Sequence, residues 1–425
     1  MAKQSARELA IAALREWRTG NQFADTILRR RLRDSELADS DRAFVTELFY
    51  GVLRNLTLLD FWIDSLRSGK LDHSTRDLLR LGLYQLFLIN IPEHAAVNET
   101  VNLANTKARS LVNAVLRNAV REKEQLVNRA NAHDLDVRES HPQFLISRWV
   151  EHFGKANTEA LCHWNNRPSP IYARINLLKT SLDDFLSEHP DAERSAEQTD
   201  FVRLSRLPAE ALTRGECYIQ DPSTALACAL LAPLQGERLL DACAAPGGKT
   251  GYLAQMMKNE GVIIACDRDR DRIKVLEGNL ERLGVSIAEF EQHDWTSDKS
   301  NPGNVTAASF DRIMVDAPCS NTGVMRRRVD LRWRLTEKDF SHMYHQQVFI
   351  LRSVIPLLKP NGVLVYSTCS IEPDENEQVI KAITDEFPFL TLEKQATSLP
   401  FRDGFDGAFA ARFHGRRLHP ASLVE

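Results

Sequence analysis

The feature that most constrains the fold is an apolar strand that runs into a glycine-rich loop and then into a helical pattern. The strand lies at 239–241, and the small residues of the loop would let a ligand approach backbone N–H groups at the helix start. Further short apolar strands follow at 262–265, 313–315 and 363–366, separated by helical patterns. This alternation predicts an α/β fold with a doubly wound, mostly parallel, Rossmann-like sheet. The loop residues are Cys243, Ala244, Ala245, Pro246, Gly247, Gly248 and Lys249.

The loop also limits the kind of ligand. Its two glycines are adjacent and a lysine follows at once, which matches neither G-x-G-x-x-G nor the Walker spacing, so a dinucleotide or a nucleoside triphosphate is disfavoured. Asp267 ends the second strand, where a carboxylate in such folds binds a ribose diol. Asp294 and Asp316 end the next two strands. Each Asp alone is typical of a turn cap, but together with the loop they predict a site for an adenosyl cofactor.

Two segments precede this domain. Apolar residues at helical spacing predict an all-α domain at the N-terminus. The middle segment mixes an amphipathic helix with strand-like runs at 171–175 and 201–204, which predicts a small α+β module. The expected domains are 1–138 (all-α), 141–232 (small α+β) and 233–425 (Rossmann-like).

Composition excludes several classes of protein. A chain of 425 residues with a net charge of -4 and 43% hydrophobic residues is typical of a multidomain globular protein. No run approaches the roughly 18 apolar residues of a membrane span, and the N-terminus lacks a secretory signal, so we expect a cytoplasmic protein with no membrane partner. The seven cysteines form no CxxC pair and no zinc spacing, which predicts reduced thiols and no metal site.

Two cysteines, Cys319 and Cys369, each come just after an apolar strand, so both thiols should point into one crevice at the sheet edge. A free cysteine is more often a small buried hydrophobe, which is how we interpret Cys228 and Cys266. Paired thiols fit a specific chemistry, because carbon 5 of a pyrimidine becomes nucleophilic enough to take a methyl group after a thiolate adds to carbon 6. A second thiol and the carboxylate of Asp316 suit the proton transfers that follow.

Three motifs carry a resemblance to a known family. DACAAPGGKT, VDAPCSNTGVMRR and VYSTCSIEPDEN closely resemble the RNA (cytosine-5)-methyltransferase family, and within it the bacterial enzymes of small-subunit rRNA. The resemblance covers the whole chain, because HAAVNETVNLAN and LVNAVLRNAV resemble the helical fold of the NusB antitermination factor. It implies a seven-stranded methyltransferase domain, S-adenosylmethionine as cofactor and 16S rRNA as substrate.

The resemblance also implies roles for individual residues. Cys369 would be the nucleophile, Cys319 would assist release of the methylated RNA, and Asp316 would stabilise the protonated ring. The implied cofactor contacts are Cys243, Ala244, Ala245, Pro246, Gly247, Gly248, Lys249, Asp267, Arg272, Asp294 and Asp316.

Basic residues with an aromatic ring follow the Cys319 motif, a pattern that suits phosphate contacts and base stacking. The predicted RNA-binding residues are Arg326, Arg327, Arg328, Arg332 and Trp333. A solvated charged face with Trp333 packed on the sheet is the alternative. For a second basic run, Arg29–Arg31, RNA binding and a plain surface role are equally supported. We expect the two N-terminal segments to hold RNA around a flipped-out cytosine.

Other functions stay open at this point. A non-catalytic RNA-binding or antitermination protein would need neither the cofactor loop nor the thiols. A DNA cytosine methyltransferase would use the Pro-Cys thiol, Cys319, for the attack, and an enzyme acting on an exocyclic amino group would need no thiol. Among RNA substrates, tRNA is the alternative to 16S rRNA, which we expect either free or in a partly assembled small subunit. The protein is expected to be a monomer.

Overall fold

The computed structural model describes residues 4–195, 200–297 and 305–416, and the contacts divide the chain into two compact units. Unit 1 consists of residues 1–167 and 325–334, and unit 2 of residues 168–324 and 335–425. The chain therefore leaves unit 2 just after the Cys319 motif, contributes a short return segment, 325–334, to unit 1, and then re-enters unit 2. Within the described ranges, no helix is long and apolar enough to cross a membrane.

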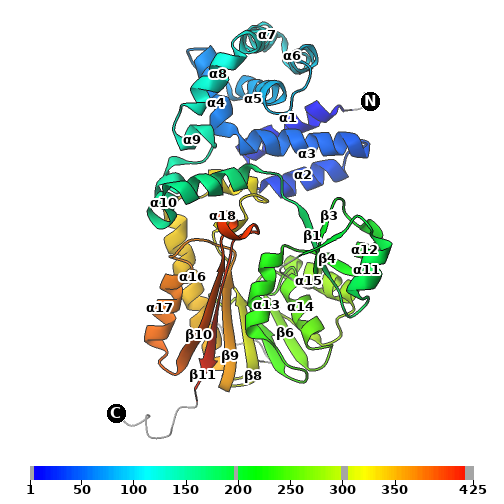
Figure 1. Ribbon diagram of the computed structural model, residues 1–425, viewed down its shortest axis with the longest axis vertical. Helices are drawn as coiled ribbons and strands as arrows, with labels where there is room; N and C mark the ends of the chain where they lie inside the picture. The colour runs from blue at the N-terminus through cyan, green and yellow to red at the C-terminus, as the bar shows by residue number, and fades with distance from the viewer. Residues whose placement is uncertain (1–3, 196–199, 298–304, 417–425) are drawn as a thin grey trace. The chain divides into compact units, whose positions relative to one another are not determined.

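Unit 1 is helical, which confirms the all-α prediction for the N-terminal part. Leu9, Phe49, Leu79 and Leu116 come from four different helices and are buried in one apolar core. Such cores form because residues three or four apart share one face of a helix. The helices (Figure 1) are α1 (Ala6–Thr19), α2 (Ala24–Arg33), α3 (Asp39–Arg54), α4 (Leu56–Leu66), α5 (His73–Phe87), α6 (Glu93–Asn102), α7 (Thr106–Arg121), α8 (Lys123–Asn131), α9 (Leu135–Arg138) and α10 (Gln143–Asn166).

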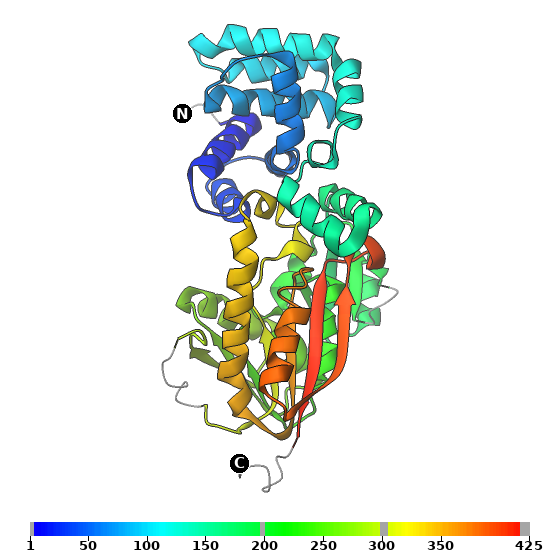
Figure 2. The same ribbon diagram turned by 90° about the vertical axis from the view of Figure 1, so that its left-hand side faces the viewer.

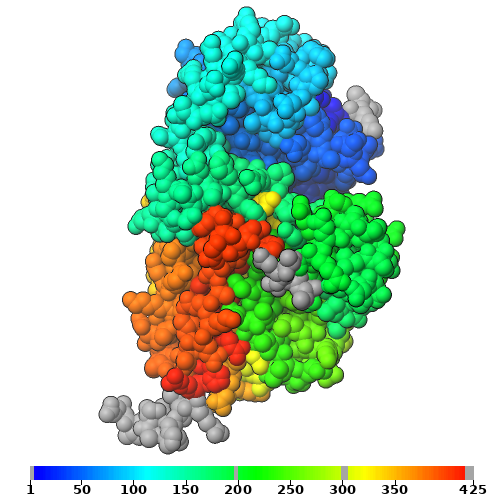
Figure 3. All heavy atoms as spheres, in the orientation of Figure 1, coloured from blue at the N-terminus to red at the C-terminus, as the bar shows by residue number. Residues whose placement is uncertain are grey.

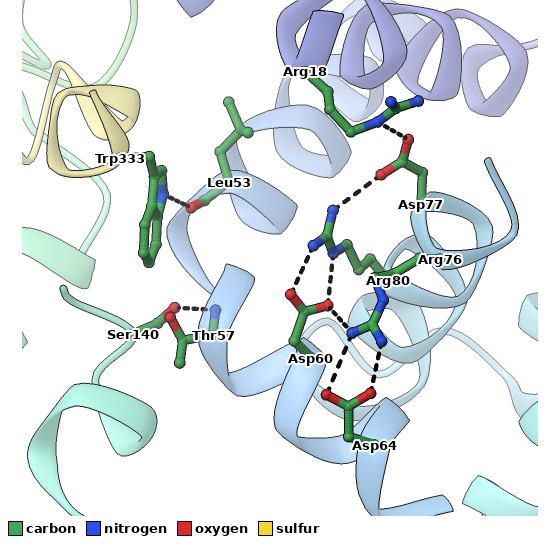
Figure 4. A network of polar contacts seen from close by, with 10 residues as sticks. All are labelled: Arg18, Leu53, Thr57, Asp60, Asp64, Arg76, Asp77, Arg80, Ser140 and Trp333. Atoms are coloured by element: carbon green, nitrogen blue, oxygen red, sulfur yellow. Dashed lines mark hydrogen bonds and ion pairs between the residues drawn. The ribbon is translucent and has the colours of Figure 1, made fainter. Parts of the chain in front are cut away.

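A chain of ion pairs connects three of these helices (Figure 4). Arg18 of α1 pairs with Asp77 of α5 at 3.0 Å, and Asp77 also pairs with Arg80 at 3.0 Å. Arg80 and Arg76 both reach Asp60 of α4, at 2.7 and 3.1 Å. Asp77 is almost completely buried, and a buried carboxylate needs such partners to offset the loss of water. The network therefore fixes α1, α4 and α5 relative to one another.

Two segments outside residues 1–138 also belong to unit 1. Helix α10 contributes Trp149, which is fully buried, although α10 lies beyond the predicted boundary of the helical domain. The return segment contains the short 3-10 helix η3 (Val329–Trp333), and Val329 is buried in the same apolar core as the N-terminal helices. The sequence of this short segment does not indicate which part of the chain it packs against, so its membership of unit 1 was not predicted.

Unit 2 begins with a small antiparallel sheet in the order β2-β3-β1-β4. Ala173 at the centre of β1 pairs with Val202 on one side and Ile219 on the other. The strands predicted at 171–175 and 201–204 are confirmed. The elements are β1 (Ile171–Ile175), α11 (Leu182–Glu188), β2 (Glu193–Arg194), β3 (Phe201–Leu204), α12 (Ala209–Arg214) and β4 (Cys217–Ile219).

The main sheet of unit 2 has seven strands in the order β10-β11-β9-β8-β5-β6-β7. Five of them, from β9 to β7, are parallel, and β10 and β11 are antiparallel additions at one edge. The doubly wound, mostly parallel sheet is therefore confirmed. The strands are β5 (Arg238–Asp241), β6 (Val262–Asp267), β7 (Ala288–Gln292), β8 (Phe310–Asp316), β9 (Leu358–Thr368), β10 (Leu390–Ser398) and β11 (Ala408–Gly415).

Helices cover both faces of this sheet, because alternate residues of each buried strand point to opposite sides. Leu240 packs in the same cluster as residues of α16 and α17, which cover one face (Figure 2), while Leu239 packs with α13 and α14 on the other. Figure 3 shows α13 (green) next to the C-terminal strands (orange to red), in agreement with its contacts to β11. The remaining elements are η1 (Pro222–Thr224), α13 (Ala225–Leu231), α14 (Gly248–Met256), α15 (Arg270–Leu283), η2 (Thr322–Val324), α16 (Glu337–Val354), η4 (Ile355–Leu357), α17 (Glu377–Glu386) and α18 (Pro400–Asp403).

Candidate active site

The glycine-rich loop leaves β5 at the carboxyl edge of the sheet, as predicted. Its backbone is held by the neighbouring strands, because Ala242 N–H donates to Met314 O at 2.9 Å and Ala244 N–H donates to Cys266 O at 2.8 Å. Gly247 begins α14 with a φ of 103°, in the left-handed region that favours glycine. A Cβ at Gly247 would also lie 2.9 Å from a methyl carbon of Leu276. The loop therefore needs glycine for both backbone conformation and close packing.

Asp267 and Arg272 form one side of the predicted cofactor site. Asp267 ends β6, is nearly buried, and accepts a hydrogen bond from Asp269 N–H at 3.0 Å. Arg272 pairs with Asp267 at 3.3 Å and donates to Ala245 O in the loop at 2.5 Å. The arginine thus connects the loop to the acidic residue at the end of the next strand, which keeps the two parts of the site together.

Asp294 lies two residues beyond β7 rather than at its end. Its carboxylate accepts hydrogen bonds from Thr296 N–H at 2.9 Å and from the Thr296 hydroxyl at 2.6 Å. These hydrogen bonds hold the pKa of Asp294 below its usual range. Most of the hydrogen bonds of Asp294 are therefore those of a turn cap, the simpler interpretation of this residue. A contact between Asp294 and the cofactor stays a prediction.

The hydrogen bonding of Asp241, the last residue of β5, shows whether the site fits an adenosyl cofactor with an amino-acid part. One carboxylate oxygen accepts from the Thr250 hydroxyl at 2.7 Å, and the other has no hydrogen-bond partner among the described residues. Burial raises the pKa of Asp241 to about 7. A buried acceptor beside the loop, with Asp267 placed for a ribose diol, suits a ligand that has both an amino group and a ribose. S-adenosylmethionine has both.

The two predicted thiols lie in direct contact. Cys319 Sγ is 3.2 Å from Cys369 Sγ, although the residues are on different loops, after β8 and β9. The hydrogen bond to Cys369, together with burial, raises the pKa of Cys319 well above its ordinary value. Cys319 is therefore protonated at neutral pH. Asn321, which the sequence reasoning did not single out, accepts a hydrogen bond from Cys369 Sγ at 3.1 Å.

A lysine–carboxylate pair connects the loop to the thiols. Lys249 Nζ lies 2.7 Å from one oxygen of Asp316, and the Ser367 hydroxyl donates to the other oxygen at 2.9 Å. Burial lowers the pKa of Lys249, but the carboxylate of Asp316 raises it more, so the net pKa is above the ordinary value. Lys249 therefore carries a positive charge at the edge of the site.

A pocket lies next to Cys369 inside unit 2. Its lining includes Lys249, Cys369, Ser223, Thr224, Asp406 and Phe409. Polar groups converge here on an apolar wall, which is the usual composition of a small-molecule or base pocket. Ser223, Thr224, Asp406 and Phe409 were not found from the sequence, because they come from η1 and from the segment around β11, far from the recognised motifs.

The basic segment after Cys319 requires a correction. Arg332 is fully buried and donates hydrogen bonds to Ser140 O at 3.2 Å and to the Asn166 side chain at 2.8 Å. Trp333 donates from its indole N–H to Leu53 O at 2.7 Å and packs on the helical core (Figure 4), not on the sheet. Both residues are thus structural parts of unit 1, and RNA contact does not follow from their position.

The other three basic residues differ in exposure. Arg326 is largely buried, with its guanidinium 4.1 Å from the ring centre of Trp164, whereas Arg327 is half-buried and Arg328 is exposed. In the second basic run, Arg30 and Arg31 both pair with Glu16. Among the predicted RNA-binding residues, Arg327 and Arg328 therefore remain the candidates for phosphate contacts.

Comparisons with known families match three parts of the chain. Residues 228–414 match the family described as 16S rRNA methyltransferase RsmB/F, residues 4–121 match the NusB family, and residues 141–205 match a ferredoxin-like domain of RsmF/B-like methyltransferases. The NusB match lies in the helical part, the ferredoxin-like match covers α10 and most of the small sheet, and the RsmB/F match covers the seven-stranded sheet.

Individual proteins are similar over almost the whole chain. The probable ribosomal RNA small subunit methyltransferase B of Bacillus subtilis is 34% identical over 433 residues, which covers 95% of both chains. The ribosomal RNA small subunit methyltransferase B of an Enterobacter species is 34% identical and covers 97% of this chain and 99% of its own. The crystal structure of PH0851 superimposes with a TM-score of 0.78 at 25% identity and covers 96% of this chain and 98% of its own.

Proposed function

This chain belongs to the ribosomal RNA small subunit methyltransferase B family, and we propose that it methylates carbon 5 of a cytosine in 16S rRNA with Cys369 as the nucleophile. The observation that carries the proposal is the pair of thiols in contact at 3.2 Å, beside a pocket and next to the cofactor loop. A non-catalytic RNA-binding protein, the alternative function, would have no use for two thiols in contact. S-adenosylmethionine, bound by the loop and Asp267, supplies the methyl group.

The two thiols have different parts in the reaction. Cys369 attacks carbon 6 of the cytosine, and the bond that forms makes carbon 5 nucleophilic enough to take the methyl group. The proton on carbon 5 must then leave, and the Cys369–carbon 6 bond must break. The carboxylate of Asp316 can accept the carbon 5 proton. Cys319, which burial and its contact with Cys369 hold protonated, can give its proton to the Cys369 sulfur as the Cys369–carbon 6 bond breaks.

Asp316 and Lys249 provide the charges around the base. Addition at carbon 6 raises the basicity of the ring, and the carboxylate of Asp316 stabilises the protonated ring nitrogen. The Lys249 ammonium, 2.7 Å from Asp316, orients this carboxylate and keeps it near the pocket. Asp241 stays beside the loop as an acceptor for the amino group of the cofactor.

The proposed partner is RNA, and the protein acts as a monomer in the cytoplasm on 16S rRNA that is free or in a partly assembled subunit. Arg327 and Arg328 contact phosphates of the RNA. A cytosine in structured RNA is rotated out of its stack to reach Cys369.

The test is transfer of labelled methyl groups to undermethylated 16S rRNA, with denaturing gels that show protein–RNA adducts. Cys369→Ala is expected to lose activity and form no adduct, whereas Cys319→Ala accumulates adduct because release is blocked. The reverse pattern would assign the attack to Cys319, as in a DNA-type enzyme, and an active Cys369→Ser would indicate methylation of an exocyclic amino group. If methyl groups were transferred to tRNA and not to 16S rRNA, the proposed substrate would be wrong.

A further inference from the structure

Each of the two thiols is followed in sequence by a serine, and both serines bind the same buried carboxylate. Ser320 follows Cys319, and its N–H donates to Glu375 Oε2 at 2.8 Å while its hydroxyl donates to Glu375 Oε1. Ser370 follows Cys369, and its hydroxyl donates to Glu375 Oε1 at 2.7 Å. Glu375 therefore connects the loop after β8 to the loop after β9, and these are the loops that carry the thiols.

Glu375 is itself held firmly in place. Its side chain is completely buried, and Gln347 of α16 donates to Oε2 at 3.0 Å and also to Pro318 O at 3.0 Å. The Tyr366 hydroxyl of β9 donates to the backbone carbonyl of Glu375 at 2.6 Å. A buried carboxylate with hydrogen bonds to both oxygens has one favoured position, and the groups bound to it share that constraint.

We infer that Glu375 is a positioning residue that holds Cys319 and Cys369 in contact by binding Ser320 and Ser370. This inference rests on the proposed function, in which both thiols act on one base. The carboxylate does not reach the reacting atoms, and it acts through the two serines next to the thiols. Without it, two separate loops would have to keep their sulfur atoms at 3.2 Å through backbone contacts such as the bond from Gly323 N–H to Cys369 O at 3.0 Å.

If Glu375 positions the thiols, its removal should lower the rate of the reaction but leave cofactor binding almost unchanged. Glu375→Ala is expected to lower kcat about 100-fold, the size of effect that a displacement of about 1 Å produces at a reacting centre. KM for S-adenosylmethionine should change less than about threefold, because Asp241, Asp267 and the loop do not contact Glu375. Glu375→Gln keeps an acceptor oxygen of the same shape and should restore kcat to within about tenfold of the wild-type value.

Phenylarsine oxide reports the sulfur–sulfur contact without any methyl transfer. One molecule of this arsenical bonds to two neighbouring thiols and releases water, so its affinity for the full-length protein depends on how close Cys319 and Cys369 are. Binding is measured as protection of the two thiols from iodoacetamide, by mass spectrometry of the peptides. Glu377 is exposed, and the control variant Glu377→Ala should bind the arsenical with the same affinity as wild type. The affinity of Glu375→Gln should lie within about threefold of the wild-type value. Glu375→Ala should bind at least tenfold more weakly than wild type.

The two measurements give distinct outcomes. The inference would be overturned if Glu375→Ala bound the arsenical with wild-type affinity. It would also be overturned if Glu375→Ala lowered kcat and the affinity for S-adenosylmethionine equally and Glu375→Gln showed the same losses. If Glu375→Ala does not fold, the double variant Ser320→Ala with Ser370→Ala carries the test, because it removes both hydroxyl donors to Glu375 and leaves the carboxylate in place. Wild-type values for both kcat and arsenical affinity in this double variant would then overturn the inference. Activity of Cys369→Ala on RNA would instead refute the proposed function and leave the arsenical result as the test of the positioning role.

Discussion

The carboxylate of Asp330 lies at the first turn of α2, where it accepts a hydrogen bond from the backbone N–H of Ala24 at 2.9 Å. The same oxygen accepts from the Trp17 indole at 3.1 Å and from Arg334 Nε at 3.0 Å. The residue that precedes α2, Phe23, provides no side-chain cap of its own. A residue of the return segment, 306 positions away in sequence, therefore caps a helix of the N-terminal part.

Removal of this cap should destabilise unit 1. Asp330→Ala leaves the Ala24 N–H and the Trp17 indole N–H without their acceptor, and we expect a loss of about 2 to 4 kcal/mol in the free energy of unfolding. Urea unfolding followed by circular dichroism measures it. The control is Glu337→Ala, an exposed acid in the first turn of α16, for which we expect less than about 0.5 kcal/mol. Equal stability of the two variants would contradict the capping role.

The titration of Cys319 should depend on Cys369. The hydrogen bond between the sulfurs is the largest cause of the raised pKa of Cys319, so Cys369→Ala should lower that pKa. Burial remains, so the pKa stays above the ordinary value. The measurement is the pH at which iodoacetamide modifies Cys319 at half its maximal rate. Cys228→Ala removes a buried thiol elsewhere and should leave the value unchanged, and an unchanged value in Cys369→Ala would refute the coupling.

Stability should fall as pH rises through the titration of Asp241. Burial raises the pKa of Asp241 to about 7 from 3.8, so the folded state binds a proton more tightly than the unfolded state between these values. Asp241→Asn resembles the protonated form and removes this dependence. We therefore expect the free energy of unfolding of the variant minus that of wild type to be larger at pH 8 than at pH 5 by about 2 to 3 kcal/mol, because only wild type loses stability over this range. Guanidinium unfolding at both pH values measures it, and parallel curves would count against the raised pKa.

Two glycines provide a matched pair of substitutions. A Cβ at Gly323 would lie 2.7 Å from Cys369 O and 2.7 Å from Gly407 Cα, whereas a Cβ at Gly278 on α15 meets nothing within 4 Å. Gly323→Ala should lower methyl transfer at least tenfold, since the backbone of the nucleophile must move. Gly278→Ala should keep full activity and gain about 0.5 to 1 kcal/mol of stability. The prediction fails if Gly323→Ala is as active as Gly278→Ala.

Much of the catalytic half could be predicted from the sequence, because its signals are local. A short apolar run followed by glycines or by Asp indicates a buried strand and its carboxyl end, and parallel strands bring such ends together. This reasoning placed Asp267, Asp316 and both thiols at one edge of the sheet. Their contacts agree with that placement, while their roles stay predictions. The antiparallel strands β10 and β11 lacked an equally clear pattern and were not predicted.

The sequence by itself determined the types of the main elements and the loops that hold the cofactor and thiol motifs, since each depends on a few consecutive residues. Only the tertiary structure decided that the two sulfurs are in contact, that Glu375 binds both neighbouring serines, and that Arg332 and Trp333 belong to a helical core. The physical reason is that packing partners are set by the whole fold: Trp333 and Leu53, for example, are 280 residues apart. A basic and aromatic run has the same local pattern whether it meets RNA or a distant part of its own chain.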